Sequence, residues 1–449
     1  MKKYFLNLLP INLQQKIKSS IGLQEIILNT AWLFGDKILR MGVGVIVGIW
    51  VARYLGPDMF GLLNYATAFV ALFGVLATFG LNSIVVRDLV KDKDNTNVTL
   101  GTAFVLQLCG GLLGYTLIAL AIYFARPDDG QAGIVVMILG FSLVFRCIDT
   151  VRYWFESQVQ SKYIVWIENG IFLFMALTQG VLVLVQAPFL AFVWVNFANV
   201  LLVSAGLIFV YTWRVGMMTS WVIDFQYAKA LLKECWPLLL SGIAIMIYMR
   251  IDQIMLGQML GNDAVGIYSV AIRMSEVWYF IPVAIVASVF PSIVNAKEKS
   301  KTLYKDRLQK LYDLMVLMGL SVAIPMTFIS DYLIFLLFGE EYSAAGIVLA
   351  IHIWAGIFVS LSVVNTKWLI LDGFQKNIFY MALLGAVVNI VANWMLIPIF
   401  GIKGAALGTV ISQFVSLFSV VFYRGTKVSA LRMGKSFILN KTFYRILKV

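Results

Sequence analysis

Residues 55–66 read LGPDMFGLLNYA, and they end one long apolar segment and begin the next. Residues 260–271 read LGNDAVGIYSVA and hold the same place between two later apolar segments, 205 positions along the chain. The two stretches align without gaps and agree at five of twelve positions. A repeat at half the chain length predicts two similar halves arranged around a central axis.

The composition assigns the chain to a lipid bilayer. Of 449 residues, 61% are hydrophobic and 13% are charged, and the mean hydropathy is +0.88. A water-soluble globule of this length needs more polar surface. The apolar runs are unbroken and show no strand alternation, so we expect an all-α polytopic membrane protein of about twelve transmembrane helices in two pseudo-symmetric six-helix lobes. The predicted spans are 27–54, 61–86, 99–125, 131–156, 164–186, 189–213, 232–260, 264–294, 311–337, 344–371, 378–399 and 403–423.

The basic residues predict the orientation of the chain. The net charge is +12, and 25 of the 35 lysines and arginines fall in the termini and in alternate loops. The opposite loops contain only Arg126 and Lys403. This asymmetry follows the positive-inside rule, so we expect both termini in the cytoplasm and no nucleic-acid partner. The basic run at 296–310 is interpreted as a cytosolic loop, with a regulatory or lipid-headgroup site as the alternative.

These spans predict four parts of the chain. Residues 1–25 form a cytoplasmic interfacial segment, 26–215 the first lobe, 216–424 the second lobe, and 425–449 a basic cytoplasmic tail. Glycines at the repeated turns permit a tight reversal and a close start to the next helix. The two aspartates are expected to cap those helices. The turn residues are Gly56, Asp58 and Gly61 in the first copy and Gly261, Asp263 and Gly266 in the second.

Catalytic and metal chemistry find little support in the sequence. Cys109, Cys147 and Cys235 are interpreted as small apolar residues, and His352 as a packed histidine rather than a proton relay. We expect no metal site, no catalytic residues and no cofactor. The predicted exterior connections are short, which disfavours a membrane glycosyltransferase or polymerase.

Charges inside the predicted spans are the candidate functional residues. Each costs at least roughly 2.5 to 3.5 kcal/mol near the bilayer centre, so these side chains should face protein or a watered cavity. Four arginines lie near mid-depth, and a planar guanidinium suits phosphate oxygens, so we predict an anionic, phosphate-bearing cargo. These hypothetical cargo contacts are Arg40, Arg146, Arg250 and Arg273.

Pairing is the competing interpretation of the same charges. Asp36 with Arg40, the series Arg146, Asp149, Arg152 and Glu156, and Arg273 with Glu276 all have helical spacings of three or four residues. Three carboxylates are candidates either for proton exchange or for fixed counter-charges, and the residues alone leave both roles open. These are Asp36, Asp149 and Glu276.

Short motifs in a constant order resemble a known family. The chain is similar to the Wzx-type oligosaccharide flippases of bacterial surface-polysaccharide synthesis, within the multidrug/oligosaccharidyl-lipid/polysaccharide exporter superfamily. The matching residues are Asn29, Trp32, Ala52-Arg53-Tyr54-Leu55-Gly56-Pro57, Gly61, Gly80-Leu81, Arg87, Asp252, Gly257, Gly266, Tyr268, Ala271, Pro291, Leu337-Phe338-Gly339, Tyr342, Ala344-Ala345, Asn389, Pro398, Gly401 and Gly404-Ala405-Ala406.

The resemblance implies a fold, a location and a cargo. It implies lobes like those of multidrug and toxin extruders (MATE-like), related by a pseudo-twofold along the membrane normal and opening alternately to each side of the bacterial inner membrane. The cargo is an undecaprenyl-diphosphate-linked oligosaccharide for O-antigen, capsule or exopolysaccharide synthesis. The expected partners are membrane lipids, a polysaccharide polymerase and a chain-length regulator. The sequence does not identify the coupling ion and leaves H⁺ and Na⁺ open. A cation-coupled multidrug extruder of the same fold is the first alternative, and a membrane-embedded glycosyltransferase or polymerase the second.

Overall fold

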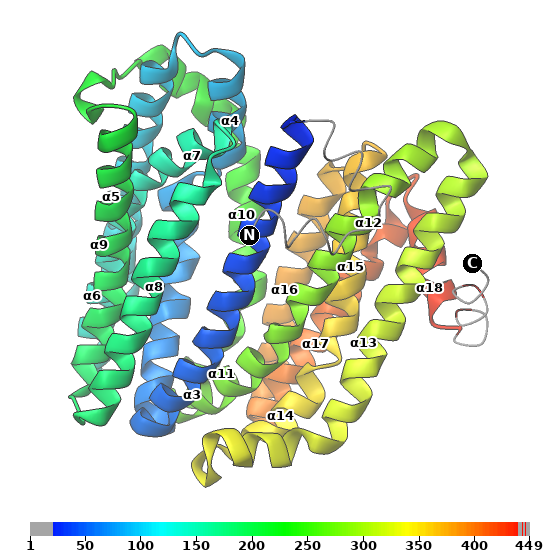
Figure 1. Cartoon of the computed structure of the whole chain (residues 1–449). Coiled ribbons are helices and arrows are strands. Elements are labelled where there is room, and N and C mark those ends of the chain that lie inside the picture. Colours follow the sequence, from blue (N-terminus) through cyan, green and yellow to red (C-terminus); the bar gives the residue numbers. More distant parts are fainter. Residues whose placement is uncertain (1–20, 439–441, 443–444, 446–449) are drawn as a thin grey trace.

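A computed structural model describes the backbone of residues 21–438 together with Thr442 and Arg445, and the side chains from Leu39 onward. The described chain is almost entirely helical (Figure 1). The prediction of an all-α fold is therefore confirmed. The α-helices are α3 (Ile21–Thr78), α4 (Asn82–Lys91), α5 (Thr96–Ala125), α6 (Gly130–Phe141), α7 (Asp149–Ser157), α8 (Ser161–Leu184), α9 (Phe189–Arg214), α10 (Phe225–Met259), α11 (Asn262–Glu276), α12 (Phe280–Lys299), α13 (Lys301–Phe338), α14 (Ala345–His352), α15 (Ala355–Leu371), α16 (Lys376–Phe400), α17 (Ile402–Phe418) and α18 (Lys427–Ser436).

The membrane spans match the predicted set. Eleven stretches within the described residues are long and apolar enough to cross a membrane. The first of them contains two predicted helices, because α3 is broken by non-helical backbone at Gly56, where φ is 70° and ψ is 173°. Shorter helices combine into other spans, as α6 and α7 do within Gly130–Ser157. The predicted lobe boundary, at residues 215 and 216, lies in the connection between α9 and α10.

The repeated stretch forms a reciprocal crossing between the halves. Gly261 has φ 93° and ψ −177°, close to the backbone conformation of Gly56, so both turns use the left-handed region that favours glycine. A Cβ added to Gly61 would lie 1.9 Å from the carbonyl oxygen of Asn262, and one on Gly266 would lie 2.0 Å from that of Pro57. Pro57 and Asn262 are equivalent positions of the repeat, so each copy packs its glycine on the other's turn. Only glycine permits this approach.

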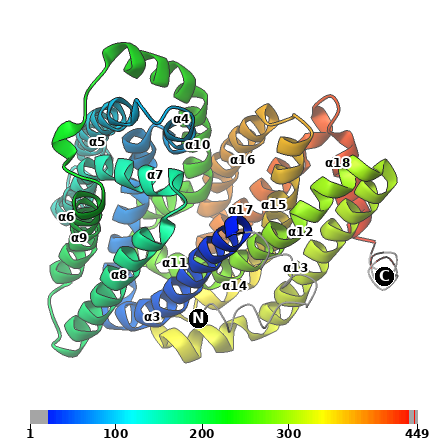
Figure 2. The ribbon, with the colours of Figure 1, turned by 45° about the horizontal axis from the view of Figure 1, so that its top comes forward.

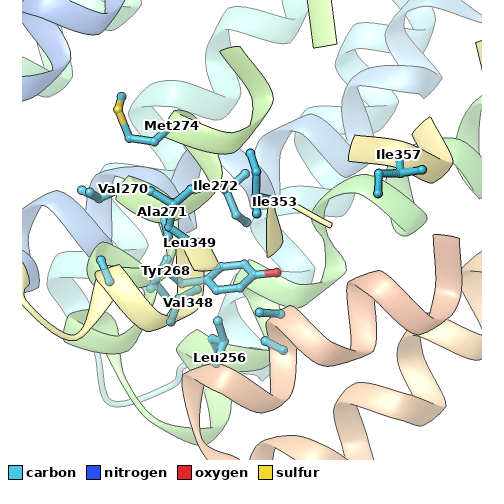
Figure 3. Close-up of a cluster of buried hydrophobic side chains, with 14 of the residues drawn as sticks. Leu256, Tyr268, Val270, Ala271, Ile272, Met274, Val348, Leu349, Ile353 and Ile357 are labelled. Atoms are coloured by element: carbon cyan, nitrogen blue, oxygen red, sulfur yellow. The ribbon is translucent and has the colours of Figure 1, made fainter. Parts of the chain in front are cut away.

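We call the end of the molecule that bears these two turns the closed end. Most helices of the two halves of the chain form two separate groups (Figure 1). The groups meet at the closed end and diverge toward the opposite end, which we call the open end. The first half of α3 lies between the two groups in both views (Figure 2). Buried apolar side chains from α10, α11, α14 and α15 pack around Tyr268 (Figure 3), and they belong to one large core cluster that also includes α3.

The capping expectation for the repeat is wrong in the second copy. The residue that precedes α11 is Gly261, and no side-chain hydrogen bond caps this helix. Asp263 lies inside the first turn instead. A carboxylate there still interacts favourably with the positive end of the helix dipole, although it forms no cap.

Candidate substrate cavity

A central cavity of about 610 Å³ lies between the halves. It begins near the closed end at Val51 and Phe60 and extends to Arg40, which precedes the Gly56 turn by 16 residues, or about 24 Å of helix. The helices α3, α8, α9, α10 and α11 supply its walls. The lining residues used below are Arg40, Gly48, Phe60, Asn64, Phe172, Gln179, Asn196, Asn199, Arg250, Gln253, Arg273 and Glu276.

Two of the predicted arginines face this cavity from the second half of the chain. Arg250 on α10 and Arg273 on α11 both line it, and neither forms an ion pair with a described residue. The Arg273 guanidinium carbon lies 5.5 Å from the centre of the Phe60 ring. Its Nη1 occupies the space beside Gly48, where an added Cβ would come within 2.2 Å of that atom. A cation placed against apolar surface and a glycine keeps its hydrogen-bond donors available for a ligand.

Arg40 faces the same cavity from the first half and is held by α8. Its Nη2 lies 2.8 Å from Oε2 of Glu168, and its Nε donates to Oδ1 of Asn169 at 3.2 Å. The guanidinium carbon also lies 5.9 Å from the Phe172 ring centre. Arg40 is thus positioned by the first lobe, whereas Arg250 and Arg273 lie on the second. The arginines of the two halves therefore converge, as predicted for these three.

Arg146 does not line the cavity, so its predicted place there is wrong. The α-helix α6 continues as a 3₁₀ helix over Ser142–Ile148. A 3₁₀ helix has fewer residues per turn, so the side chains of this segment point in other directions than they would on a regular α-helix. The guanidinium instead pairs with Asp149 at 3.5 Å, and its side chain is 49% exposed. Asp149 also pairs with Arg152 at 3.6 Å. Two arginines on one carboxylate favour a fixed counter-charge, one of the two roles the sequence left open for Asp149.

The predicted pairing in the series Arg146, Asp149, Arg152 and Glu156 differs in the structure at Arg152. Arg152 pairs with Glu168 of α8 in addition to Asp149. Because Glu168 also holds Arg40, one chain of alternating charges connects the cavity wall with α7. The predicted Arg152 and Glu156 contact is not an ion pair.

The other two candidate carboxylates have different outcomes. Glu276 lines the cavity, but its predicted ion pair with Arg273 is not formed. The helix changes to a 3₁₀ turn immediately after Glu276, and Arg273 is turned toward Phe60 instead. The side chain of Asp36 lies outside the described residues.

Amides complete the cavity and were missed from the sequence. Five of them line it, on helices from both halves. Asn64 and Asn196 each donate to a backbone carbonyl one helical turn earlier, which fixes their orientation. The available signal was an Asn or Gln inside an apolar span, but the sequence interpretation counted only charges. Amides both donate and accept hydrogen bonds, so this wall suits a hydroxyl-rich ligand.

Asp252, close in sequence to Arg250, serves a buried network outside the lining. Its carboxylate accepts hydrogen bonds from the Tyr268 hydroxyl, from Thr409 at 3.3 Å and from the Gln253 backbone N–H at 2.9 Å. The residue is 3% exposed. It joins α10 to α11 and α17 within the second half.

This architecture defines a multi-pass membrane transporter with a central cavity lined by both halves of the chain. The model of the polysaccharide biosynthesis protein family matches residues 50–347, which is well over half of the sequence. The chain belongs to that family. It is 26% identical over 406 residues to a protein named probable flippase AglR of Haloferax volcanii, an alignment that covers 86% of this chain and 80% of that relative.

Solved structures show the same fold. An inward-facing MATE family multidrug resistance transporter superposes with a TM-score of 0.71 at 13% identity, covering 88% of this chain and 95% of that one. The lipid II flippase MurJ in an inward closed conformation gives a TM-score of 0.69 at 13% identity, with 92% of each chain covered. The predicted MATE-like fold is therefore confirmed. The family match and the flippase relative confirm the predicted flippase class.

Proposed function

We propose that this flippase moves an undecaprenyl-diphosphate-linked oligosaccharide from the cytoplasmic to the outer leaflet of the bacterial inner membrane by alternating access. The observation that carries the cargo is the pair Arg250 and Arg273, two cavity arginines that share one nearby carboxylate, Glu276, and form no ion pair with a described residue. A diphosphate presents oxygens for forked guanidinium contacts, and the amide wall suits the sugar hydroxyls. The AglR relative is named a probable flippase and MurJ a flippase of lipid II, which supports a lipid-borne cargo.

The distribution of basic residues supports a direction for the cycle. The positive-inside rule places the open end, with most lysines and arginines, in the cytoplasm. With this orientation the structure corresponds to a state that is closed to the exterior and ready to load from the inner leaflet. The inward-facing state of the matching MATE family transporter supports this assignment. A polysaccharide polymerase and a chain-length regulator would receive the product on the outer side.

Export of surface polysaccharide tests the cargo assignment. In a strain that lacks its own flippase, Arg250→Ala and Arg273→Ala should each stop export and leave lipid-linked repeat units in the inner leaflet. Arg250→Lys should restore only part of the activity, because an ammonium makes no forked contact. Arg146→Ala is the matched control and should export normally, since that side chain lies outside the cavity. Normal export by both cavity variants would remove the assignment.

Of the two candidate carboxylates whose side chains the structure describes, Glu276 has the environment expected of a coupling group. It lines the cavity and forms no ion pair with a described residue, so it is open to a proton or a sodium ion. We expect Glu276→Gln to uncouple transport from the proton or sodium gradient while cargo binding persists. The measurement is flipping in vesicles with each gradient imposed separately. Unchanged gradient dependence in the variant would assign the coupling elsewhere.

The MATE fold raises drug extrusion as a competing task, and the cavity argues against it. Its charged lining comprises three arginines and one glutamate, which repels cationic drugs. Expression in a strain without drug pumps should leave resistance unchanged. A reproducible rise in resistance to cationic drugs would favour the extruder.

A further inference from the structure

A second cavity, of about 410 Å³, lies at the open end and shares no lining residue with the central one. It is formed where α12 meets α13, beside the end of α15 and against α18. Part of its wall comes from the basic run at 296–310, for which the sequence left open a cytosolic loop or a headgroup site. We call it the basic pocket. Its lining residues used below are Lys297, Lys301, Tyr304, Lys305, Trp368, Asp372, Phe374, Val428 and Arg432.

The basic pocket contains more positive side chains than its one carboxylate can neutralise. Lys297 is paired with Asp372 at 2.5 Å and also donates to the Leu371 carbonyl at 2.9 Å. Asp372 is the single carboxylate in the lining. Lys301, Lys305 and Arg432 form no ion pair with a described residue, so three cations remain uncompensated.

The remaining polar groups of the pocket are mostly donors. Lys301 and Lys305 are separated by one helical turn on α13 and so project from the same face. Trp368 is 3% exposed, and its indole N–H is directed at the Tyr304 hydroxyl. The Tyr304 hydroxyl in turn donates to Asp372 at 3.2 Å. Ammonium and guanidinium donors around one space fit an anion with several acceptor oxygens, and phosphate has that form.

The surroundings of the pocket indicate where such a phosphate comes from. On α18, Val428 and Leu431 are 49% and 66% exposed, whereas Ala430 and Met433 are buried against the protein. Lys427 and Lys435 lie near the two ends of the same helix. An apolar outer face with flanking lysines is the pattern of a helix at a membrane surface. The pocket beside it is therefore placed at the level of lipid headgroups.

We propose that the basic pocket binds the phosphate headgroup of an anionic membrane lipid, separately from the cargo cavity. The three uncompensated cations supply charge, and α18 holds the site at the bilayer surface. This site does not depend on the identity of the cargo. Loss of lipid binding with normal cavity function, and the reverse, would be distinguishable results.

Lipid binding to the purified full chain tests the proposal. Native mass spectrometry would compare dioleoylphosphatidylglycerol with dioleoylphosphatidylcholine on the same preparation. We expect a clear preference for phosphatidylglycerol, and a loss of at least tenfold in its affinity in the triple variant Lys301→Gln, Lys305→Gln, Arg432→Gln. The matched control removes three exposed lysines that lie at the same end but outside the pocket, Lys93→Gln, Lys229→Gln and Lys233→Gln, and should bind as the wild type does.

A gain of binding separates the site from a folding defect. Asp372→Asn removes the pocket's carboxylate and frees Lys297, so the affinity for phosphatidylglycerol should rise several-fold. Equal lipid binding by the wild type, the pocket variant and the control variant would overturn the proposal. Inorganic pyrophosphate that binds the pocket in detergent, without any lipid preference, would also overturn it and would point to a soluble phosphate compound.

Discussion

Arg126 joins the two halves of the molecule at the closed end, and its removal should shift the protein toward a state that is open there. It follows α5 in the first half and donates across the interface to the Gly257 carbonyl at 2.5 Å and to Oδ1 of Asn262 at 2.7 Å. Its guanidinium carbon lies 3.9 Å from the Tyr65 ring centre, and the side chain is only 9% exposed. In the sequence this residue counted only as one of two exterior cations.

The expected size of the shift comes from the two contacts that cross the interface. A hydrogen bond that involves a charged group contributes about 1.5 to 3 kcal/mol. Two of them give at most about 6 kcal/mol, and water that reaches both acceptors after truncation lowers this value. A loss of about 3 kcal/mol changes the ratio of closed to open molecules about 150-fold. If the open form makes up about 1% of the wild type, Arg126→Ala brings the two forms to similar populations.

Electron–electron distance measurements would detect this change. Spin labels at the exposed positions Asp128 and Glu340, in a background without the three native cysteines, report the separation of the halves at the closed end. Arg53→Ala is the control. Arg53 also crosses the interface, with a 2.9 Å bond to the Leu336 carbonyl, but it is exposed and its bond is replaced readily by water.

We call the contacts of Arg126 with Gly257 and Asn262 the Arg126 clamp. Two results would refute its proposed role. One is a distance distribution for Arg126→Ala that coincides with that of the wild type. The other is a double-mutant cycle of Arg126→Ala with Asn262→Ala in which the two effects simply add, because residues in direct contact should show a coupling energy.

Two further predictions concern the cavity and the C-terminal region. Gly48→Ala should displace the end of the Arg273 side chain without altering any charge, so export should fall severalfold without stopping as it does in Arg273→Ala; export at the wild-type level by Gly48→Ala would contradict the contact. Arg445→Ala should lower the thermal stability of the purified protein, by about 2 to 3 kcal/mol, because it leaves the fully buried Asp313 carboxylate without its cation. Differential scanning fluorimetry would measure the shift against Lys435→Ala, an exposed neighbour that should have no effect, and an unshifted melting temperature for Arg445→Ala would contradict the prediction.

The repeat and the spans were accessible from sequence because they depend on local chemistry. Gly56 and Gly261 mark backbone that other residues adopt with difficulty, and apolar runs of sufficient length are read directly as spans. The depth of Arg250 and Arg273 followed from counting residues along regular helices. Their place in the cavity agrees with that estimate.

The errors arose where a helix is irregular or where a contact joins distant segments. Arg146 was placed on an ideal helix, but the 3₁₀ segment before Asp149 rotates it out of the cavity. Arg126 is separated from Asn262 by 136 positions, and no spacing rule connects them. The basic pocket likewise depends on α18 lying against α13, a tertiary contact that the run at 296–310 does not contain.

The positions of the arginines suggest how cargo binding is linked to the movement of the halves. Arg40 is held in the first half by Glu168 and Asn169, whereas Arg250 and Arg273 project from the second half and form no ion pair with a described residue. Glu276, the one carboxylate in the lining, does not neutralise both of them, so positive charge remains between the halves. In the proposed function, a diphosphate bound there supplies negative charge and favours the approach of the halves. When the halves approach at the open end, the Arg126 contacts at the closed end must break. Cargo binding and the Arg126 clamp therefore shift the same equilibrium, between the two states of the halves, in opposite directions.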